Sequence, residues 1–538
     1  MKKVLAMILV LLMVLSIVAC TAKPVEMTEE PAATTAVEKP EEATSPEATE
    51  DDKYGGVYRF AMFYVTNTFF TPKGSGSMKY FVTPSIEPLA REEADGTITP
   101  FLAESFTCDA DKLTMTIKLR EGIQFHDGSE LNAEVLKWNL DYAINAGKAA
   151  ALSNPTAVTV IDDYTVEIQY AAWSVSWEAD MLNVLVYSKK AYDDNGEEWC
   201  ATQMIGTGPF IMESYTVDDK IVWTKNENYW QEGLPYLDGM ELVWIYDTTA
   251  SASAFMNKEI DNFDTSDGAA IGMMLNAGFT SSAPKLTANC TFGFALPASA
   301  NKDSKLNDVN VRKALLYGVD WNGVAAAASG GYGEWKNQLG YEDAYNYDAN
   351  IETVQYDLEK GKQYLADAGC ADGFTTNIWT ITNNKANLAA ATALQAEMAK
   401  LGITAELQVV DTSVITPMRV NDCPEGIIIL GHALSKDMTA TLINNYSPYG
   451  VTQTHMIAFS DAYVAALDKA IAAATMEDRI AALQEACGIL TYEEVLLYPA
   501  FYIPKYQFTQ EYVHDTGANQ VSAFQWTPEL IWKDVDAR

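Results

Sequence analysis

No single hydrophobic core can organise a chain of this length. The sequence has 538 residues, whereas a single core stops growing at about 250–300 residues. Its composition is 48% hydrophobic, which is enough apolar material to form packed cores instead of a disordered chain. We therefore expect a globular protein with two or more lobes and room for a deep cleft.

The N-terminus carries the pattern of an export signal that ends in a lipidated cysteine. Two lysines precede an almost unbroken apolar run over residues 4–18, and Ala19 and Cys20 follow it. The run is short for a membrane span, which needs about 20 residues. Residues 17–20 match the bacterial lipobox, in which the cysteine thiol receives a diacylglyceryl group. We predict a signal peptide over residues 1–19 and lipidation at Cys20. The alternative is an ordinary signal peptide with a coincidental cysteine.

The segment after the cysteine is low in complexity. Residues 21–53 are rich in Pro, Thr, Ala and Glu and lack aromatic side chains, so they cannot bury enough surface to offset the entropy of ordering. We expect residues 20–53 to be a lipid anchor followed by a disordered acidic tether. The protein is thus predicted to lie on the outer face of the cell membrane, exported and held by lipid.

The charge of the chain excludes one class of partner. The formal net charge is −37, and no cluster of Lys and Arg reverses it locally. Such a surface repels phosphate backbones, so we expect no nucleic-acid binding.

Cysteine and histidine give no metal or redox motif. Six cysteines follow Cys20 without a C-x-x-C, and the sequence leaves open whether they form disulfides or buried thiols. The four histidines form no H-E-x-x-H or similar pattern. We expect no metal and no cofactor.

Strand-like and helix-like periods alternate in the first part of the body. Residues 113–119 alternate apolar and polar side chains, which predicts a half-buried strand. Asn132 is a good N-cap for a helix that begins after it. Residues 156–170 hold two alternating runs around a pair of aspartates and predict a hairpin. Residues 86–205 are thus expected to form a compact α+β unit.

The rest of the body alternates strands and helices. Three strand-like runs joined by Gly, Pro and Asn turns lie within residues 206–247 and predict a sheet. A helix followed by a strand, as at residues 386–411, is typical of α/β lobes. Further helices are predicted at residues 311–319, 357–368, 461–474 and 476–494, and a buried strand at 426–431.

Several separated segments resemble family 5 of the bacterial extracellular solute-binding proteins, the oligopeptide-, dipeptide- and nickel-binding lipoproteins of ABC importers. The similarity extends over nearly the whole body and follows the family's order. The segments are PSIEPLA (84–90), LAESF (102–106), KLTMTIKLREGIQFHDGSELNAEVLKWNLD (112–141), GTGPF (206–210), NENYWQEGLPYLDGMEL (226–242), NDVNVRKALLYGVD (307–320), YDLEKGKQYLADAG (356–369) and LQAEMAKLGITAEL (394–407).

This resemblance implies an α/β fold, the two-lobed periplasmic-binding-protein clamshell of the class II or cluster C type. Lobe 1 is expected from residues 54–85, 206–296 and 500–538, with an extra α+β domain at 86–205. Lobe 2 is expected at 297–499. The chain would cross twice between the lobes and form a hinge. Ligand binding would favour the closed state of the two lobes, and an ABC permease in the membrane would recognise that state. We expect a monomeric, non-enzymatic receptor.

The resemblance also places candidate ligand contacts. In peptide binders of the family, an aspartate after the strand at 426–431 pairs with the ligand's α-amino group, and here Asp437 is the only carboxylate in that stretch. The family's common Trp and Asp-Pro pattern is missing there. The loop after the first strand adds Tyr64 and Asn67. Trp335, Tyr332 and Trp379 are candidate stacking surfaces, although aromatic side chains are more often core.

The class of ligand stays open between related alternatives. Short peptides are the leading hypothesis, because backbone hydrogen bonds to an extended ligand tolerate varied side chains. An oligosaccharide, or another small solute such as a metal chelate, is the rival within the family. A surface-anchored hydrolase would need a nucleophile and base or two poised carboxylates, and no G-x-S-x-G motif is present. A sensor or adhesin that lost its transporter is a further alternative.

Three motifs with possible chemistry have structural interpretations. His126 and Asp127, followed by Gly128, are interpreted as a turn and not as a catalytic pair. The GTGPF segment lacks the Lys-Ser/Thr of a phosphate loop and is interpreted as a turn entering a strand. For Arg312 we expect a buried structural pairing.

Overall fold

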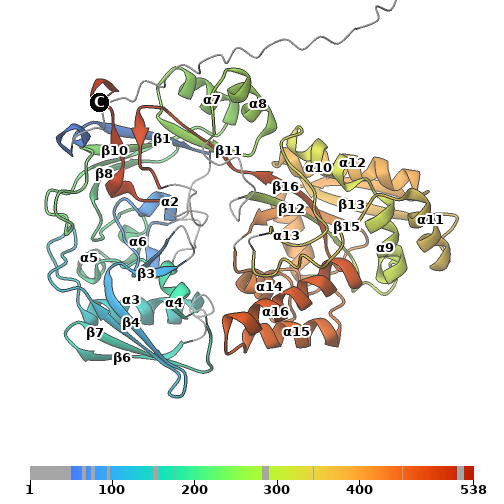
Figure 1. Cartoon of the computed structure of the whole chain (residues 1–538), viewed down its shortest axis with the longest axis horizontal. Helices are drawn as coiled ribbons and strands as arrows, with labels where there is room; N and C mark the ends of the chain where they lie inside the picture. Colours follow the sequence, from blue (N-terminus) through green and yellow to red (C-terminus); the bar gives the residue numbers. More distant parts are fainter. Residues whose placement is uncertain are drawn as a thin grey trace, which may run out of the picture. The chain divides into compact units, whose positions relative to one another are not determined.

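The computed structural model (Figure 1) places one compact unit over Thr49–Arg538. The predicted signal peptide, Cys20 and most of the tether lie outside the described residues. The last four tether residues, Glu50–Lys53, form a short 3-10 helix, η1. Lys53 lies over the rings of Tyr236 and Trp532, at 5.2 and 5.8 Å from their centroids. The described residues are 50–537 except 64–67, 74–78, 94–96, 149–154, 176, 282–289, 343, 435, 451 and 518–525.

A six-stranded sheet in the order β17-β11-β1-β10-β9-β8 organises the first lobe. Its strands β10 and β11 run parallel to β1, whereas β9, β8 and β17 pair antiparallel. The three runs predicted within residues 206–247 are confirmed as β8, β9 and β10. The strands are β1 (Val57–Met62), β8 (Phe210–Thr216), β9 (Lys220–Lys225), β10 (Gly239–Trp244), β11 (Asn262–Thr265) and β17 (Tyr506–Thr509).

The two faces of this sheet bury different cores, because side chains alternate along a strand. Phe60 and Met62 pack with Trp223 on one face. Ala61 and Phe263 face the helices α7 (Thr248–Met256) and α8 (Gly268–Asn276) on the other. The register that pairs Phe60 with Asn262 puts the side chain of Asn262 on the first of these faces.

An antiparallel sheet in the order β4-β5-β7-β6 forms the core of the extra unit. Helix α3 (Ala133–Ala143) packs on it and begins as predicted, with Asn132 Oδ1 accepting from Val135 N at 3.1 Å. The strands are β4 (Ala103–Asp109), β5 (Thr114–Leu119), β6 (Pro155–Asp162) and β7 (Thr165–Tyr170). A small ladder of β2 (Ala90–Glu92) and β3 (Ile98–Pro100) and the helices α4 (Trp177–Asp180), α5 (Lys189–Asn195) and α6 (Glu197–Cys200) complete it.

Glu87 ties three of the family-like segments together. Its carboxylate is buried and accepts from Thr207 Oγ1 at 2.8 Å, Tyr229 OH at 2.6 Å and Trp230 Nε1 at 3.0 Å. A Cβ added at Gly206 would lie 2.2 Å from the Ser85 carbonyl oxygen, so this turn packs directly against the segment that carries Glu87. The GTGPF segment is therefore a turn that enters β8, as predicted.

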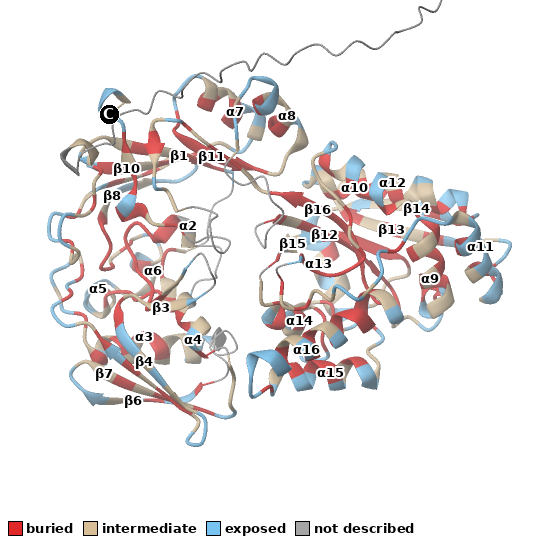
Figure 2. Cartoon of the chain, viewed as in Figure 1, coloured by how far each residue is buried: buried red, intermediate tan, exposed pale blue. Residues whose placement is uncertain are grey.

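A five-stranded sheet in the order β14-β13-β15-β12-β16 organises the second lobe. β13 runs parallel to β14 and β15, and β12 pairs antiparallel with β15 and β16. Figure 2 shows β12 and β16 buried along nearly their whole length. The strands are β12 (Cys290–Pro297), β13 (Thr375–Ile381), β14 (Thr404–Val410), β15 (Ile427–Ala433) and β16 (Tyr498–Pro504).

Helices cover both faces of the second sheet. Residues of α9 (Val309–Gly318), α10 (Trp321–Ser329), α11 (Leu358–Asp367) and α12 (Lys385–Lys400) pack on one core. Residues of α13 (Thr412–Asn421), α14 (Thr439–Asn445), α15 (Asp461–Ile471) and α16 (Met476–Gly488) pack on the other. The helix predicted at 476–494 ends earlier, because residues Ile489–Glu493 continue as a π-helix, η8.

The strands correct two expected lobe boundaries. The boundaries at 296/297 and 499/500 fall inside β12 and β16, which both belong to the second sheet. The chain therefore passes between the sheets before Cys290 and again after Pro504, where Lys505 alone separates β16 from β17.

Candidate functional site

The carboxyl ends of β13, β14 and β15 lie along one edge of the second sheet. Ligands of open α/β sheets commonly bind outside this edge. At the end of β15, His432 Nε2 lies 2.7 Å from the hydroxyl of Tyr446. The segment that follows β15 carries Asp437, the carboxylate that the sequence singles out.

Asp437 lies in the loop before α14 and pairs with Arg479 of helix α16. Its Oδ2 lies 3.0 Å from Arg479 Nη2, and the Arg479 side chain is 4% exposed whereas that of Asp437 is 29% exposed. Asp437 Oδ1 accepts from Thr439 N at 2.9 Å, at the start of α14. The carboxylate is thus fixed in position and neutralised, with one side toward solvent.

Arg479 also lies where the first lobe reaches the second. Its Nε donates to Thr439 Oγ1 at 3.2 Å, and its Nη1 lies 3.5 Å from Ser174 Oγ in the extra unit. Next to Ser174, Trp173 Nε1 donates to the carbonyl of Ala474 at 3.3 Å. The ion pair of Asp437 is therefore built at a contact between the two lobes.

Charges of both lobes act on the pKa of Tyr345. Burial raises the pKa of Tyr345, the carboxylates of Asp437 and Glu92 raise it further, and Arg479 lowers it. Glu92 belongs to β2 of the first lobe. Burial lowers the pKa of Lys79 to about 8, against a smaller opposite effect of Glu92. We call Lys79, Glu92, Tyr345, Asp437 and Arg479 the interlobe cluster.

A second polar group lies where the chain passes between the sheets. Lys505, between β16 and β17, forms an ion pair with Asp264 Oδ2 on β11. On the same face, Asn262 Nδ2 donates to Thr509 Oγ1 at 2.7 Å, and Gln507 is the register partner of Asp264. We call Asn262, Asp264, Lys505 and Gln507 the crossing cluster.

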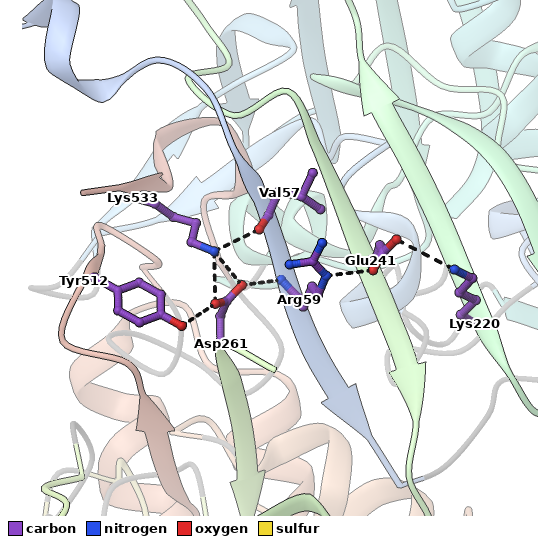
Figure 3. Close-up of polar contacts among 7 residues, drawn as sticks. All are labelled: Val57, Arg59, Lys220, Glu241, Asp261, Tyr512 and Lys533. Atoms are coloured by element: carbon purple, nitrogen blue, oxygen red, sulfur yellow. Dashed lines mark hydrogen bonds and ion pairs between the residues drawn. The ribbon is translucent and has the colours of Figure 1, made fainter. Parts of the chain in front are cut away.

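Asp261, which immediately precedes β11, belongs to a hydrogen-bonding network with a structural role (Figure 3). Asp261 accepts from Lys533 Nζ at 3.0 and 3.1 Å, from Tyr512 OH at 2.9 Å and from Arg59 N at 2.7 Å. Lys533 Nζ also donates to the carbonyl of Val57 at 3.1 Å. Lys533 and Asp261 are both buried. This network fastens the C-terminal segment to β1 and leaves no oxygen of Asp261 unused.

The other predicted ligand contacts fall in different surroundings. Trp335 is 8% exposed, packs in the core of the second lobe and donates from Nε1 to the carbonyl of Pro499 at 2.9 Å. Trp379 is half-buried on β13 and donates to the carbonyl of Glu425 at 2.9 Å. Tyr332 lies near the crossing, with its ring 6.2 Å from that of Tyr506. Tyr64 and Asn67 lie outside the described residues.

The structural interpretations of two motifs are confirmed. His126 is half-buried, and its Nε2 lies 2.9 Å from the Gly208 carbonyl. Burial lowers the pKa of His126. Asp127 accepts from Ser188 Oγ at 2.5 Å and serves the turn. Arg312 is buried and donates to the carbonyls of Leu306, Asn307 and Glu494 at 2.7–2.9 Å.

The described residues also answer the question about the cysteines. All six cysteines in the described ranges are free thiols.

Within the described ranges no three side chains of His, Cys, Asp or Glu gather as metal ligands. None of the helices that the structure describes combines the length and the apolar character that crossing a membrane requires.

Sequence reasoning missed Arg479, although a signal for it exists. A single charge on an apolar stripe of a helix indicates a buried partner. The buried residues of α16 are Arg479, Ala482, Leu483, Ala486, Cys487 and Gly488. Asp264 and Lys505 give no comparable signal, because they come from distant segments and become neighbours only through the crossing.

Comparison with known proteins assigns this chain to a family. The profile of the bacterial extracellular solute-binding proteins, family 5 Middle, matches residues 97–453. The chain belongs to this family. Among curated proteins, the glutathione-binding protein GsiB of Salmonella typhi is 26% identical over 338 residues, which cover 59% of this chain and 62% of GsiB. The match therefore spans less than two thirds of that relative.

Solved structures of two-lobed periplasmic binding proteins share the fold. DppA of Helicobacter pylori, in complex with the peptide STSA, superimposes with a TM-score of 0.75 at 20% identity, covering 90% of this chain and 99% of DppA. The oligopeptide-binding protein AppA of Bacillus subtilis, in complex with a nonapeptide, gives 0.73 at 18% identity, covering 90% and 99%. The predicted family and clamshell fold are confirmed, and both are those of binding proteins and not of enzymes.

Proposed function

We propose that this family 5 protein is the lipid-anchored receptor of an ABC importer, and that it captures short peptides between its lobes and delivers them to a permease. The observation that carries the proposal is the double crossing between two separately built sheets. A ligand that contacts both lobes stabilises the closed arrangement, since it has more contacts there. A permease can distinguish this arrangement from the open one.

The interlobe cluster supplies chemistry suited to a peptide. We propose Asp437 as the acceptor for the ligand's α-amino group, because each carboxylate oxygen can accept a second hydrogen bond. Arg479 positions Asp437, and the hydroxyl of Tyr345 is a neighbouring donor or acceptor. Support also comes from DppA and AppA, which share the fold and hold peptides in their solved complexes.

The anchoring part of the proposal rests on the sequence of the N-terminus. A diacylglyceryl group on Cys20 gives two acyl chains, and stable anchoring usually needs more than one. The acidic tether after Cys20 would hold the body away from the membrane surface, because like charges extend it.

A thermal-shift panel on the purified protein tests the ligand class. The probes are Ser-Thr-Ser-Ala, glutathione, maltotriose and the nickel–histidine chelate. A ligand that binds only the folded state stabilises it by about 2.7 kcal/mol at 100 times its Kd, so a peptide should raise the melting temperature. A shift with maltotriose or the chelate and none with either peptide would overturn the peptide assignment. Mass spectrometry of the recovered peptide should find it intact, whereas cleaved peptide would indicate a hydrolase.

A further inference from the structure

Two carboxylates near each other on the first sheet differ in how their oxygens are used. Both oxygens of Asp261 accept hydrogen bonds, from Lys533, Tyr512 and the Arg59 amide. Asp264 pairs with Lys505 through Oδ2, and no donor among the described residues reaches its Oδ1. The side chain of Asp264 is 6% exposed. Because buried polar atoms are nearly always hydrogen-bonded, Asp264 Oδ1 indicates a position for one further donor beyond the described residues.

A small cavity adjoins this carboxylate. Its volume is about 10 Å³, which is close to the room that one water-sized group requires. Asn262 and Gln507 contribute polar groups to its wall beside Asp264. The remaining wall is formed by Tyr58, Phe60, Ala61, Met62 and Trp526. The cavity thus admits one small polar group of a ligand and surrounds it with apolar side chains.

The charge balance selects the kind of group. Lys505, 14% exposed, already neutralises Asp264. An ammonium at Oδ1 would add an uncompensated positive charge in a buried place, which is costly, whereas Asp437 is 29% exposed, so water screens an ammonium there. A hydroxyl or an amide N–H adds no net charge and completes the hydrogen bonding of the carboxylate.

We propose that Asp264 is a ligand-contact residue and that its Oδ1 accepts a hydrogen bond from a neutral hydroxyl or amide N–H of the ligand. The inference rests on the proposed function, because it adds a subsite to the same receptor. A hydrogen bond from the ligand to Asp264 would also link the ligand to the hinge between the lobes. The acceptor is paired with Lys505, the one residue between β16 and β17, so the ligand's hydrogen bond acts on the residue at which the chain crosses between the lobes.

Calorimetric titration of a matched pair of double variants with Ser-Thr-Ser-Ala tests the subsite. In the test variant, Asp264→Leu and Lys505→Met remove the acceptor together with its counter-charge. In the control variant, Asp261→Asn and Lys533→Met neutralise the fully bonded pair nearby. Loss of a hydrogen bond to a charged group should weaken peptide binding roughly 10- to 100-fold in the test variant, and the control variant should stay within about threefold of the wild type. Equal affinities of the test variant and the wild type overturn the proposal, and so does an equal loss in both variants.

A crystal structure of the protein with bound peptide tests independently whether the ligand contacts Asp264. The expected result is a ligand hydroxyl or amide nitrogen within about 3.2 Å of Asp264 Oδ1. A water molecule in that position, with no ligand atom near it, overturns the inference. The two proposals fail separately. If peptides do not bind and maltotriose does, the peptide assignment fails, and the same variants titrated with maltotriose still decide the role of Asp264.

Discussion

Arg479 Nη2 lies 3.0 Å from Asp437 Oδ2, and the same guanidinium reaches Ser174 of the other lobe. The arginine is almost completely buried, so removing either partner would leave a buried group without its counter-charge. The geometry makes Asp437 a fixed carboxylate and makes Arg479 a contributor to the stability of the second lobe and to the contact between the lobes.

We therefore expect Arg479→Met to lower the free energy of unfolding by about 2–4 kcal/mol. Breaking a buried pair costs about 3–5 kcal/mol, and the partial exposure of Asp437 reduces this. Urea denaturation measures the change. Lys469→Ala is the control, because Lys469 pairs with Glu485 at 3.1 Å on the surface nearby and exposed pairs contribute less than about 1 kcal/mol. Equal losses in the two variants would contradict a buried role for Arg479.

Glu87 should make the stability of the protein depend on pH. Burial raises the pKa of Glu87 to about 7 from 4.5, against the three donors that favour its charged form. Because the folded state holds the proton more tightly, the stabilisation is complete below pH 4.5 and is lost as the pH rises to about 7. The loss is on the order of 3 kcal/mol.

Glu87→Gln removes the titrating group and keeps the shape of the side chain. Unfolding in urea at pH 5, 6, 7 and 8 should give a smaller fall in stability for the variant than for the wild type. Lys79, with its pKa lowered to about 8, titrates at the upper end of this range in the wild type and in the variant alike, so its effect cancels in the comparison. A fall of the same size in the variant would assign the pH dependence to other groups.

The fold was open to prediction where a pattern is local. The alternation at residues 113–119, the Asn132 cap and the turn signals around 206–242 each predict an element that the structure contains, since neighbouring residues decide those conformations. The lobe boundaries failed at β12 and β16 for the opposite reason. A strand's sheet is decided by its partners, and these lie in distant segments.

The candidate site was predictable only in outline. Asp437 could be selected because it is the one carboxylate in its stretch. Its partner Arg479, and Tyr345 and Glu92 of the same cluster, come from three other parts of the chain and share no motif with it. Trp335 illustrates the converse, since an aromatic residue in a glycine-rich loop has the same pattern whether it stacks on a ligand or fills a core.

Gly206→Ala should be strongly destabilising. A Cβ at this position would lie 2.2 Å from the Ser85 carbonyl oxygen, so the backbone next to Glu87 would have to move. We expect a loss of at least about 2–3 kcal/mol in thermal or urea unfolding. At Gly488 the nearest atom would lie 3.4 Å away, and Gly488→Ala should change stability by less than about 1 kcal/mol. Similar changes in the free energy of unfolding for Gly206→Ala and Gly488→Ala would mean that the backbone around Gly206 can move at little cost.

Trp335→Phe distinguishes a core residue from a ligand contact. The change removes the hydrogen bond to the Pro499 carbonyl and part of a buried ring, so the free energy of unfolding should fall by about 2–4 kcal/mol. Peptide affinity should be unchanged, because the ring packs inside the second lobe. Calorimetry and urea unfolding on the same preparation separate the two effects. A higher Kd for the peptide at unchanged stability would identify Trp335 as a ligand contact.

Cys20→Ser tests the anchor on the full chain expressed in a bacterium. The thiol is the only group at that position that can receive the diacylglyceryl unit, so the variant should lose incorporation of labelled fatty acid. It should also leave the membrane fraction, because two acyl chains would be the means of attachment. A cysteine elsewhere serves as control, and Cys108→Ser, in the extra unit, should keep both label and membrane association. If the wild type carries no label and leaves the membrane fraction as the Cys20→Ser protein does, the ordinary signal peptide is the correct interpretation of residues 1–20.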